Sequence, residues 1–341
     1  MFVIVALAAV LIVSLVAPLA LKPLLLRMGV IDVPNSRSSH TRPVIRGVGL
    51  APLLAVVVGY VILLFGAYDS AQLTVLLVIL GVSLAAGLLG WVEDFHGLPV
   101  VVRAGLQLAI GLVGACAITA NHGGSWWAVL AYALGVAAYI NVTNFMDGVN
   151  GISGLHGVVV GVTYATLGVI VEAPWLTVAG LILALAFAGF LPWNLIRGGM
   201  FLGDVGSYLL GGGIAIVAVA ALAHGVLAVA VLGPIVIYLA DAGVTLVRRV
   251  LRGERWFEAH RSHVYQRLID LGLSHAQVAS IVATASACTG GLGLLVALSP
   301  AFWFGAVVLM VVVVTGYFLL GTALGRMRHY RAIVRREGTS R

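Results

Sequence analysis

Residues 71–91 read AQLTVLLVILGVSLAAGLLGW, a stretch without a single charged side chain. An α-helix needs about 20 apolar residues to cross the hydrocarbon core of a bilayer, and it satisfies its own backbone hydrogen bonds there. A strand of a membrane barrel would instead alternate apolar and polar side chains. The stretch therefore predicts a transmembrane helix.

Similar apolar runs lie on both sides of it. The full set is approximately 2–21, 49–66, 71–91, 104–120, 126–143, 155–171, 175–193, 207–222, 225–245, 276–296 and 301–321. With 62% hydrophobic and 9% charged residues, the composition excludes an ordinary soluble protein. We predict an all-α, polytopic membrane protein of about eleven transmembrane helices, forming a single domain over residues 1–341. Only Ala223, His224 and Gly225 separate two of the runs, and fusing those runs would move every later loop to the other side.

The distribution of basic residues indicates that 207–222 and 225–245 are two helices. With eleven crossings, all nineteen Lys and Arg residues fall on one face of the membrane. The positive-inside rule makes this face cytoplasmic, with the N-terminus outside the inner membrane and the C-terminal tail, 322–341, inside. The first run has no basic residue before it and Lys22 just after it, so it reads as an anchor helix. The predicted cytoplasmic loops are about 22–48, 92–103, 144–154, 194–206 and 246–275.

Ten of the twelve acidic residues also fall on or near this face, and only Asp69 and Glu172 lie on the other. Arginines mixed with carboxylates at a membrane surface suit a metal-bridged phosphate. The alternative is that inner loops collect charge simply because they are in water. The residue patterns of four of these loops distinguish a phosphate site from charge that is merely solvated.

The first two loops carry cations and a carboxylate pair. Residues 32–49 read DVPNSRSSHTRPVIRGVG, in which prolines prevent a continuous helix. The arginines could hold phosphate. Alternatively, basic residues beside a membrane helix only set its topology. The second loop contains Glu93 and Asp94, followed by Arg103. Adjacent carboxylates ionise together only beside a cation, which suggests a metal or a shared proton, or else a solvated helix end.

The next two loops combine glycines with polar side chains. Residues 141–151 read NVTNFMDGVNG, where Asn144, Asp147 and Asn150 can bind a base or ribose, or form an ordinary turn. Residues 201–207 read FLGDVGS and lead into a helix. Asp204 could cap that helix or bind magnesium.

These four loops, in this order, resemble the polyprenyl-phosphate N-acetylhexosamine-1-phosphate transferase family, which includes muramoyl-pentapeptide translocase. The resemblance covers about residues 30–270. It implies transfer of an N-acetylhexosamine-1-phosphate, or a deoxy relative, from a UDP-N-acetylsugar to polyprenyl (undecaprenyl) phosphate, with release of UMP, to initiate a cell-surface glycan. The HRSHVYQR stretch, 260–267, is similar to the O-antigen or lipopolysaccharide branch. The alternative within the family is phospho-N-acetylmuramoyl-pentapeptide transferase.

The resemblance also implies roles for individual residues. Asp204 corresponds to the magnesium ligand, with Mn²⁺ as the alternative ion, and Asp94 to the catalytic or phosphate-activating aspartate. Glu93 stands where most relatives carry aspartate, so whether it binds metal stays open. The predicted nucleotide-sugar contacts are Asn144, Asp147, Asn150, Asn194, Phe201, His260, Arg261 and His263, and the predicted lipid-phosphate contacts are Arg46 and Arg103.

The 246–275 loop has a further pattern. Val264, Leu268 and Leu271 share one face of a short helix expected to end at Gly272, and Ser274 with Gln277 resembles a capping box. This segment could bind the diphosphate or the sugar, or lie on lipid headgroups as a basic interfacial helix.

A different class of function, secondary transport of an anionic substrate, would use Asp241 as an intramembrane coupling site. The polar residues gather in the loops instead, which favours the transferase, and we expect Asp241 to pair with a nearby Arg. The predicted partners are the two substrates and membrane lipid, without nucleic acid. The oligomeric state is left open between a monomer and a homodimer.

Overall fold

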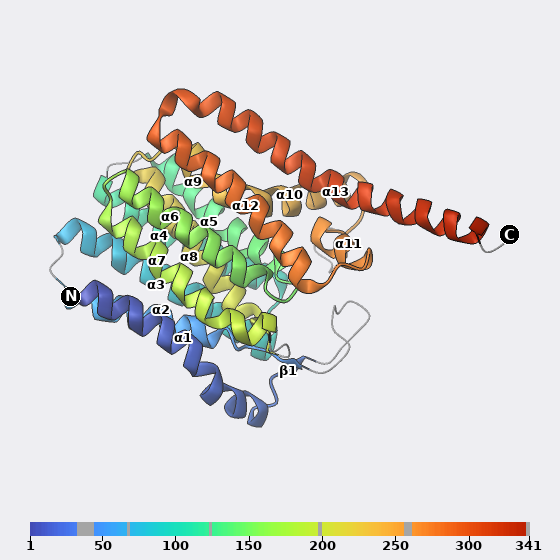
Figure 1. The fold of residues 1–341 in the computed structure, drawn as a ribbon. Helices are drawn as coiled ribbons and strands as arrows, with labels where there is room; N and C mark the ends of the chain where they lie inside the picture. The colour runs from blue at the N-terminus through green and yellow to red at the C-terminus, as the bar shows by residue number, and fades with distance from the viewer. Residues whose placement is uncertain (33–43, 67–68, 123–124, 197–199, 256–260, 339–341) are drawn as a thin grey trace.

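The structure is a computed structural model, and it describes residues 1–32, 44–66, 69–122, 125–196, 200–255 and 261–338 (Figure 1). The α-helices are α1 (Phe2–Arg27), α2 (Leu50–Leu63), α3 (Ser70–His96), α4 (Val100–His122), α5 (Trp126–Met146), α6 (Ile152–Ile170), α7 (Pro174–Leu191), α8 (Gly203–Ala223), α9 (Ala228–Leu232), α10 (Val236–Leu251), α11 (Val264–Asp270), α12 (His275–Leu298) and α13 (Trp303–Gly338). Short helices of other types are η1 (Pro192–Ile196), η2 (Gly233–Ile235) and η3 (Pro300–Phe302), and the strands are β1 (Ile31–Asp32) and β2 (Val44–Ile45).

The described part of the chain contains 10 helical spans that are long and apolar enough to cross a membrane. The shorter apolar helix α2, of 14 residues, occupies the remaining predicted run. The helices lie side by side as one bundle, with α1 along one edge and α12 and α13 along the other (Figure 1). The prediction of an all-helical polytopic membrane protein is confirmed.

The chain does divide between residues 222 and 228, as the separate runs required. Helix α8 ends at Ala223, and Gly225 takes a positive φ of 79° before α9 begins. The second run is less regular than expected, because Pro234 lies in the 3₁₀ turn η2 between α9 and α10. Proline lacks the N–H that a continuous helix needs, which accounts for the break.

Helix α8 is the centre of the bundle. Every residue from Val205 to Ala221 is buried, and α8 contacts α3, α4, α5 and α7. Its sequence is dominated by Gly, Ala and Val, and small side chains let neighbouring membrane helices approach closely. The first turn of α8, which carries Asp204, is therefore fixed against several other helices.

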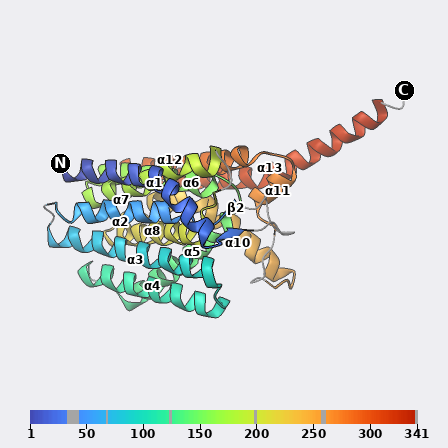
Figure 2. The same ribbon diagram turned by 90° about the horizontal axis from the view of Figure 1, so that it is seen from below.

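The described parts of the 22–48 and 246–275 loops lie at the same end of the bundle. The strands β1 and β2, the end of α10 and α11 are found there, opposite to the N-terminus (Figures 1 and 2). Strands β1 and β2 form an antiparallel pair that the sequence analysis did not predict. Helix α13 continues through the predicted tail and extends beyond the bundle at this end.

Helix α11 packs on protein, since Val264, Tyr265 and Leu268 are all buried and the helix contacts α12 and α13. It ends at Asp270, two residues before the predicted Gly272. The capping box of Ser274 and Gln277 at the start of α12 is confirmed.

Candidate active site

Two of the predicted loops are joined by their backbones. The N–H of Phe201 donates to the carbonyl of Ile45 at 2.8 Å, and the N–H groups of Val48 and Gly49 donate to the carbonyls of Phe201 and Leu202 at 3.1 and 2.9 Å. This pairing continues the edge of β2 towards the first turn of α8. As a result, Arg46 lies directly beside that turn.

The side chain of Asp94 is completely buried, and it caps α8 from another helix, α3. Its Oδ1 accepts the N–H of Asp204 and its Oδ2 accepts the N–H of Val205, both at 3.0 Å. Arg46 Nε lies 2.6 Å from Oδ1. The first N–H groups of a helix have no partner within it, and a carboxylate there also favours the helix dipole. The alternative that Asp204 caps its own helix is wrong, because Leu202 occupies the N-cap position and Asp94 supplies the acceptor.

Gly203 makes this arrangement possible. Its φ is +73°, and a Cβ at this position would lie 2.6 Å from Asp94 Oδ2 and 2.8 Å from the backbone nitrogen of Gly47. Only glycine adopts such a φ without strain and leaves room for both neighbours.

The side chain of Asp204 is partly accessible, with 15% of it exposed. Its Oδ1 accepts Asn144 Nδ2 at 2.7 Å, and its Oδ2 lies 3.0 Å from Arg46 Nη2. Arg46 therefore bridges Asp94 and Asp204. We call Arg46, Asp94, Asn144 and Asp204 the Arg46 cluster; it joins α3, α5, α8 and the segment after β2.

The two adjacent carboxylates of the second loop contact different arginines: Asp94 contacts Arg46, and Glu93 contacts Arg103. Glu93 Oε1 lies 2.8 Å from Arg103 Nη1, and its Oε2 accepts the N–H of Leu98 at 2.8 Å. Arg103 lies in the first turn of α4, within helix rather than in a loop. Glu93 and Asp94 thus contact different arginines, and Glu93 contacts both Arg103 and the backbone of Leu98.

Asp147 follows the last residue of α5, near the Arg46 cluster. Burial raises the pKa of this carboxyl group to about 8, the negative charges of Asp204 and Asp94 add to the shift, and Arg46 opposes it. At neutral pH the group is therefore mostly protonated and can donate a hydrogen bond.

Replacing Asp147 by Asn should change how stability depends on pH. A carboxyl group with a raised pKa in the folded state binds more protons folded than unfolded, so its contribution to stability is full below its unfolded pKa and is lost as pH rises towards about 8. The melting temperature of the wild type should therefore fall relative to Asp147→Asn between about pH 4 and pH 8. Thermal melts in detergent across this range measure the difference, and a constant difference would contradict the raised pKa.

Asn194 and Asn150 tie the loops together. Asn194 is buried, its Oδ1 accepts the N–H of Gly151 at 2.5 Å and its Nδ2 donates to the carbonyl of Met200 at 2.9 Å. The backbone N–H of Asn150 donates to His275 Nδ1 at 3.2 Å. Asn194 thus connects the 194–206 loop to the 144–154 loop. Phe201 contributes its backbone to the pairing with Ile45.

The predicted contacts on the 246–275 loop are only partly described. Arg261 Nη2 lies 3.1 Å from Asp270 Oδ1, His263 Nδ1 lies 3.3 Å from Asp241 Oδ1, and His260 is outside the described residues. Asp241 is paired with this histidine and with backbone N–H groups rather than with the expected Arg. Sequence reasoning missed Tyr265, whose hydroxyl donates to the carbonyl of Phe145 at 2.9 Å, and Ser207, which accepts from Asn144 Nδ2 at 3.2 Å. Both belong to motifs that were recognised, but nothing in their spacing separates them from their neighbours.

The residues present fit a magnesium ion. Within the described ranges, no three His, Cys, Asp or Glu side chains form a metal cluster of their own. Mg²⁺ needs no such cluster, because it is commonly held by one or two carboxylates together with substrate phosphates. Asp204 offers an accessible carboxylate, and the two carboxylates of Asp94 and Asp204 share the single positive charge of Arg46.

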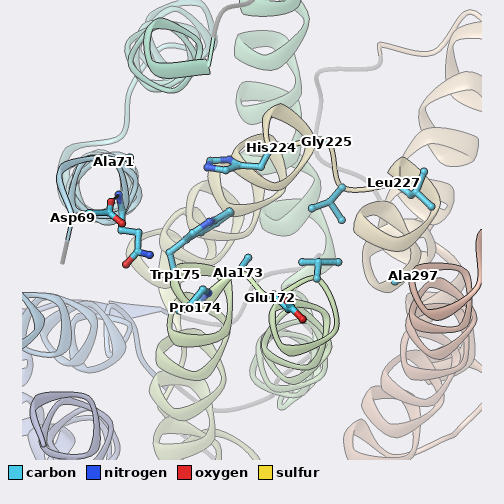
Figure 3. Close-up of a pocket in the computed structure, with 13 residues that line it drawn as sticks. Asp69, Ala71, Glu172, Ala173, Pro174, Trp175, His224, Gly225, Leu227 and Ala297 are labelled. Carbon is cyan, nitrogen blue, oxygen red and sulfur yellow. Dashed lines mark hydrogen bonds between the residues drawn. The ribbon is translucent and has the colours of Figure 1, made fainter. Parts of the chain in front are cut away.

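A pocket of about 460 Å³ lies at the start of α3, at the opposite end of this helix from Asp94. Figure 3 shows the residues that line it. It is bounded by the turns between α6 and α7 and between α8 and α9. Asp69 and Glu172, the two acidic residues predicted for the other face, both line it, and the rings of Trp175 and His224 lie 4.8 Å apart there. The predicted site residues do not line this pocket, so its volume does not mark the site assembled by the loops.

Known proteins match the chain over most of its length. It is 26% identical to a probable undecaprenyl-phosphate N-acetylglucosaminyl 1-phosphate transferase of Bacillus subtilis over 77% of each chain. It is also 26% identical to the undecaprenyl-phosphate alpha-N-acetylglucosaminyl 1-phosphate transferase of Escherichia coli K12, over 88% of this chain and 85% of that one. A decaprenyl-phosphate N-acetylglucosaminephosphotransferase of Mycobacterium tuberculosis is 27% identical over 75% and 73%. Residues 76–222, which contain most of the Arg46 cluster, match the family described as glycosyl transferase family 4.

Proposed function

We propose that this protein transfers N-acetylglucosamine-1-phosphate from UDP-N-acetylglucosamine to polyprenyl phosphate, giving a lipid diphosphate sugar and UMP. The observation that carries the proposal is the Arg46 cluster, in which an accessible Asp204 lies beside an arginine at the loop end of a membrane bundle. The names of the three relatives above support the choice of donor and lipid. The product would begin a cell-surface glycan.

The reaction is a phosphoryl transfer. An oxygen of the lipid phosphate attacks the phosphorus that bears the sugar; a new P–O bond forms, and the P–O bond to UMP breaks with its electron pair leaving on UMP. Arg46 and Arg103, whose side chains are 37% and 21% exposed, are suited to hold the negatively charged phosphates. Mg²⁺ held by Asp204 would supply charge neutralisation for the diphosphate.

Asp94 acts here as an orienting group. Its two oxygens are occupied by backbone N–H groups of α8 and by Arg46, so it fixes the start of the helix that carries Asp204 and the arginine between them. A two-step reaction through a phosphorylated aspartate would require these contacts to open. We therefore favour direct attack by the lipid phosphate.

The loop end of the bundle would face the cytoplasm, because that end carries the basic residues. Both UDP-N-acetylglucosamine and UMP are charged and do not cross a sealed membrane. Sidedness of activity can thus be measured in the same experiment that tests the reaction.

The purified protein should convert undecaprenyl phosphate, UDP-N-acetylglucosamine and Mg²⁺ to a lipid product with release of UMP. Because one diphosphate bond replaces another, the reaction should be close to equilibrium, and labelled UMP should exchange into the UDP-sugar pool. UDP-N-acetylgalactosamine serves as the comparison donor. Release of UDP without UMP exchange would overturn the proposed reaction, and activity in sealed right-side-out vesicles but not in inside-out vesicles would overturn only the orientation.

A further inference from the structure

Asp241 is a buried carboxylate that the proposed reaction does not use. It lies on α10 with no exposed surface. Its oxygens accept the N–H of Val264 at 3.0 and 3.1 Å and the hydroxyl of Tyr317 at 2.7 Å, and His263 Nδ1 lies 3.3 Å from Oδ1. One side chain therefore connects α10, the start of α11 and α13.

A carboxylate inside a membrane bundle is costly unless hydrogen bonds compensate for its lost hydration. The partners of Asp241 provide that compensation. Those at the start of α11, the N–H of Val264 and the ring of His263, do so only while α11 stays in place. Replacing one carboxylate oxygen by an amide nitrogen would leave at least one of its donors, which include the N–H groups of Val264 and Tyr265, without an acceptor. The cost of unpaired buried donors makes the attachment of α11 depend on this one residue.

Helix α11 is in turn pressed against the 144–150 segment. The hydroxyl of Tyr265 donates to the carbonyl of Phe145, and it lies so close to Gly148 that a Cβ there would be 2.3 Å away. The 144–150 segment contains Asn144, which contacts Asp204 directly. A chain of packed contacts thus runs from Asp241 through α11 to the Arg46 cluster.

We propose that Asp241, together with Tyr317, is a positioning residue that holds residues 261–270 against the 144–150 segment and thereby sets the affinity for the nucleotide-sugar. The inference rests on the proposed function for the identity of that substrate. Of the two arginines proposed to hold the lipid phosphate, Arg103 lies on α4, outside this chain of contacts, and Arg46 is reached only at its far end, through Asn144 and Asp204. Loosening α11 should therefore affect one substrate and spare the other.

The physical part of the inference can be tested without any substrate. In Asp241→Asn and Tyr317→Phe, amide hydrogen exchange of peptides covering residues 261–272 should become faster by tenfold or more for Asp241→Asn, and by less for Tyr317→Phe. Exchange in α8, residues 203–223, should stay at the wild-type rate. Tyr164→Phe is the matched control, because it removes a buried tyrosine hydrogen bond, to the carbonyl of Val231 at 3.0 Å, away from α11. Unchanged exchange at 261–272 in both test variants would overturn the attachment.

The functional part is a comparison of Michaelis constants. Asp241→Asn should raise KM for UDP-N-acetylglucosamine by about tenfold and leave KM for undecaprenyl phosphate within about twofold of wild type. Tyr317→Phe should shift the same constant by less, and Tyr164→Phe should shift neither. Equal loss for both substrates, or a lower kcat with both constants unchanged, would overturn the positioning role. A wild type with no turnover would instead refute the proposed function and leave the hydrogen-exchange result standing.

Discussion

Replacement of Asp204 by Asn is expected to reduce turnover on the order of a thousandfold, the loss typical of removing a group that stabilises charge in a transition state. The substitution keeps the size of the side chain but removes the accessible negative charge beside Arg46. It should also raise the Mg²⁺ concentration that gives half-maximal rate, and chelation of the metal should stop the wild type. Rates measured across a magnesium titration test both statements.

Asp69→Asn is the matched control for this change. Asp69 caps α3 by accepting the N–H of Gln72 at 2.8 Å, and asparagine caps a helix about as well as aspartate. The control should keep wild-type turnover and magnesium dependence. Near-normal turnover of Asp204→Asn at low magnesium would show that the metal site has been assigned to the wrong residue.

Asp94→Asn is expected to lose about a hundredfold or more in turnover for a different reason. The amide nitrogen of asparagine cannot accept a hydrogen bond, so at least one contact with Arg46 or with the N–H groups of Asp204 and Val205 is lost. Because the side chain of Asp94 is completely buried, the protein should also melt several degrees lower. The magnesium concentration for half-maximal rate should stay near that of the wild type.

The two variants can be separated by stability. Asp204→Asn relieves repulsion among neighbouring carboxylates and should melt no lower than the wild type, whereas Asp94→Asn should melt lower. Melting curves of both proteins in one detergent make the comparison. An Asp94→Asn protein with wild-type stability would contradict its role in holding α8.

The helices were predictable because a segment that crosses lipid must be apolar over about 20 residues and must satisfy its own backbone hydrogen bonds. Runs such as 71–91 had to be helical, and the brief polar gap at 223–225 was sufficient to separate α8 from α9. The loop motifs also identified residues that meet in space, since Asn144 and Asp204 are in direct contact. These features depend on local composition or on short motifs.

The contacts that define individual roles were not predictable in the same way. Asp94 caps a helix that begins 109 residues later in the chain, and its neighbour Glu93 turns to another arginine. Asn194, predicted to line the nucleotide pocket, uses both ends of its side chain to join backbone segments. Periodicity and spacing do not encode such partners, because they arise only when distant segments are packed together.

The enclosure of α8 from Val205 to Ala221 separates what can be redesigned in this protein from what cannot. An enlarged side chain along most of that stretch has little free volume to enter, so the displacement would be transmitted to Asp204 at its first turn. Helix α11 is only 7 residues long, and a buried carboxylate anchors its start. Libraries aimed at a new donor sugar should therefore vary the partly exposed positions of 261–270 and leave the α8 axis untouched.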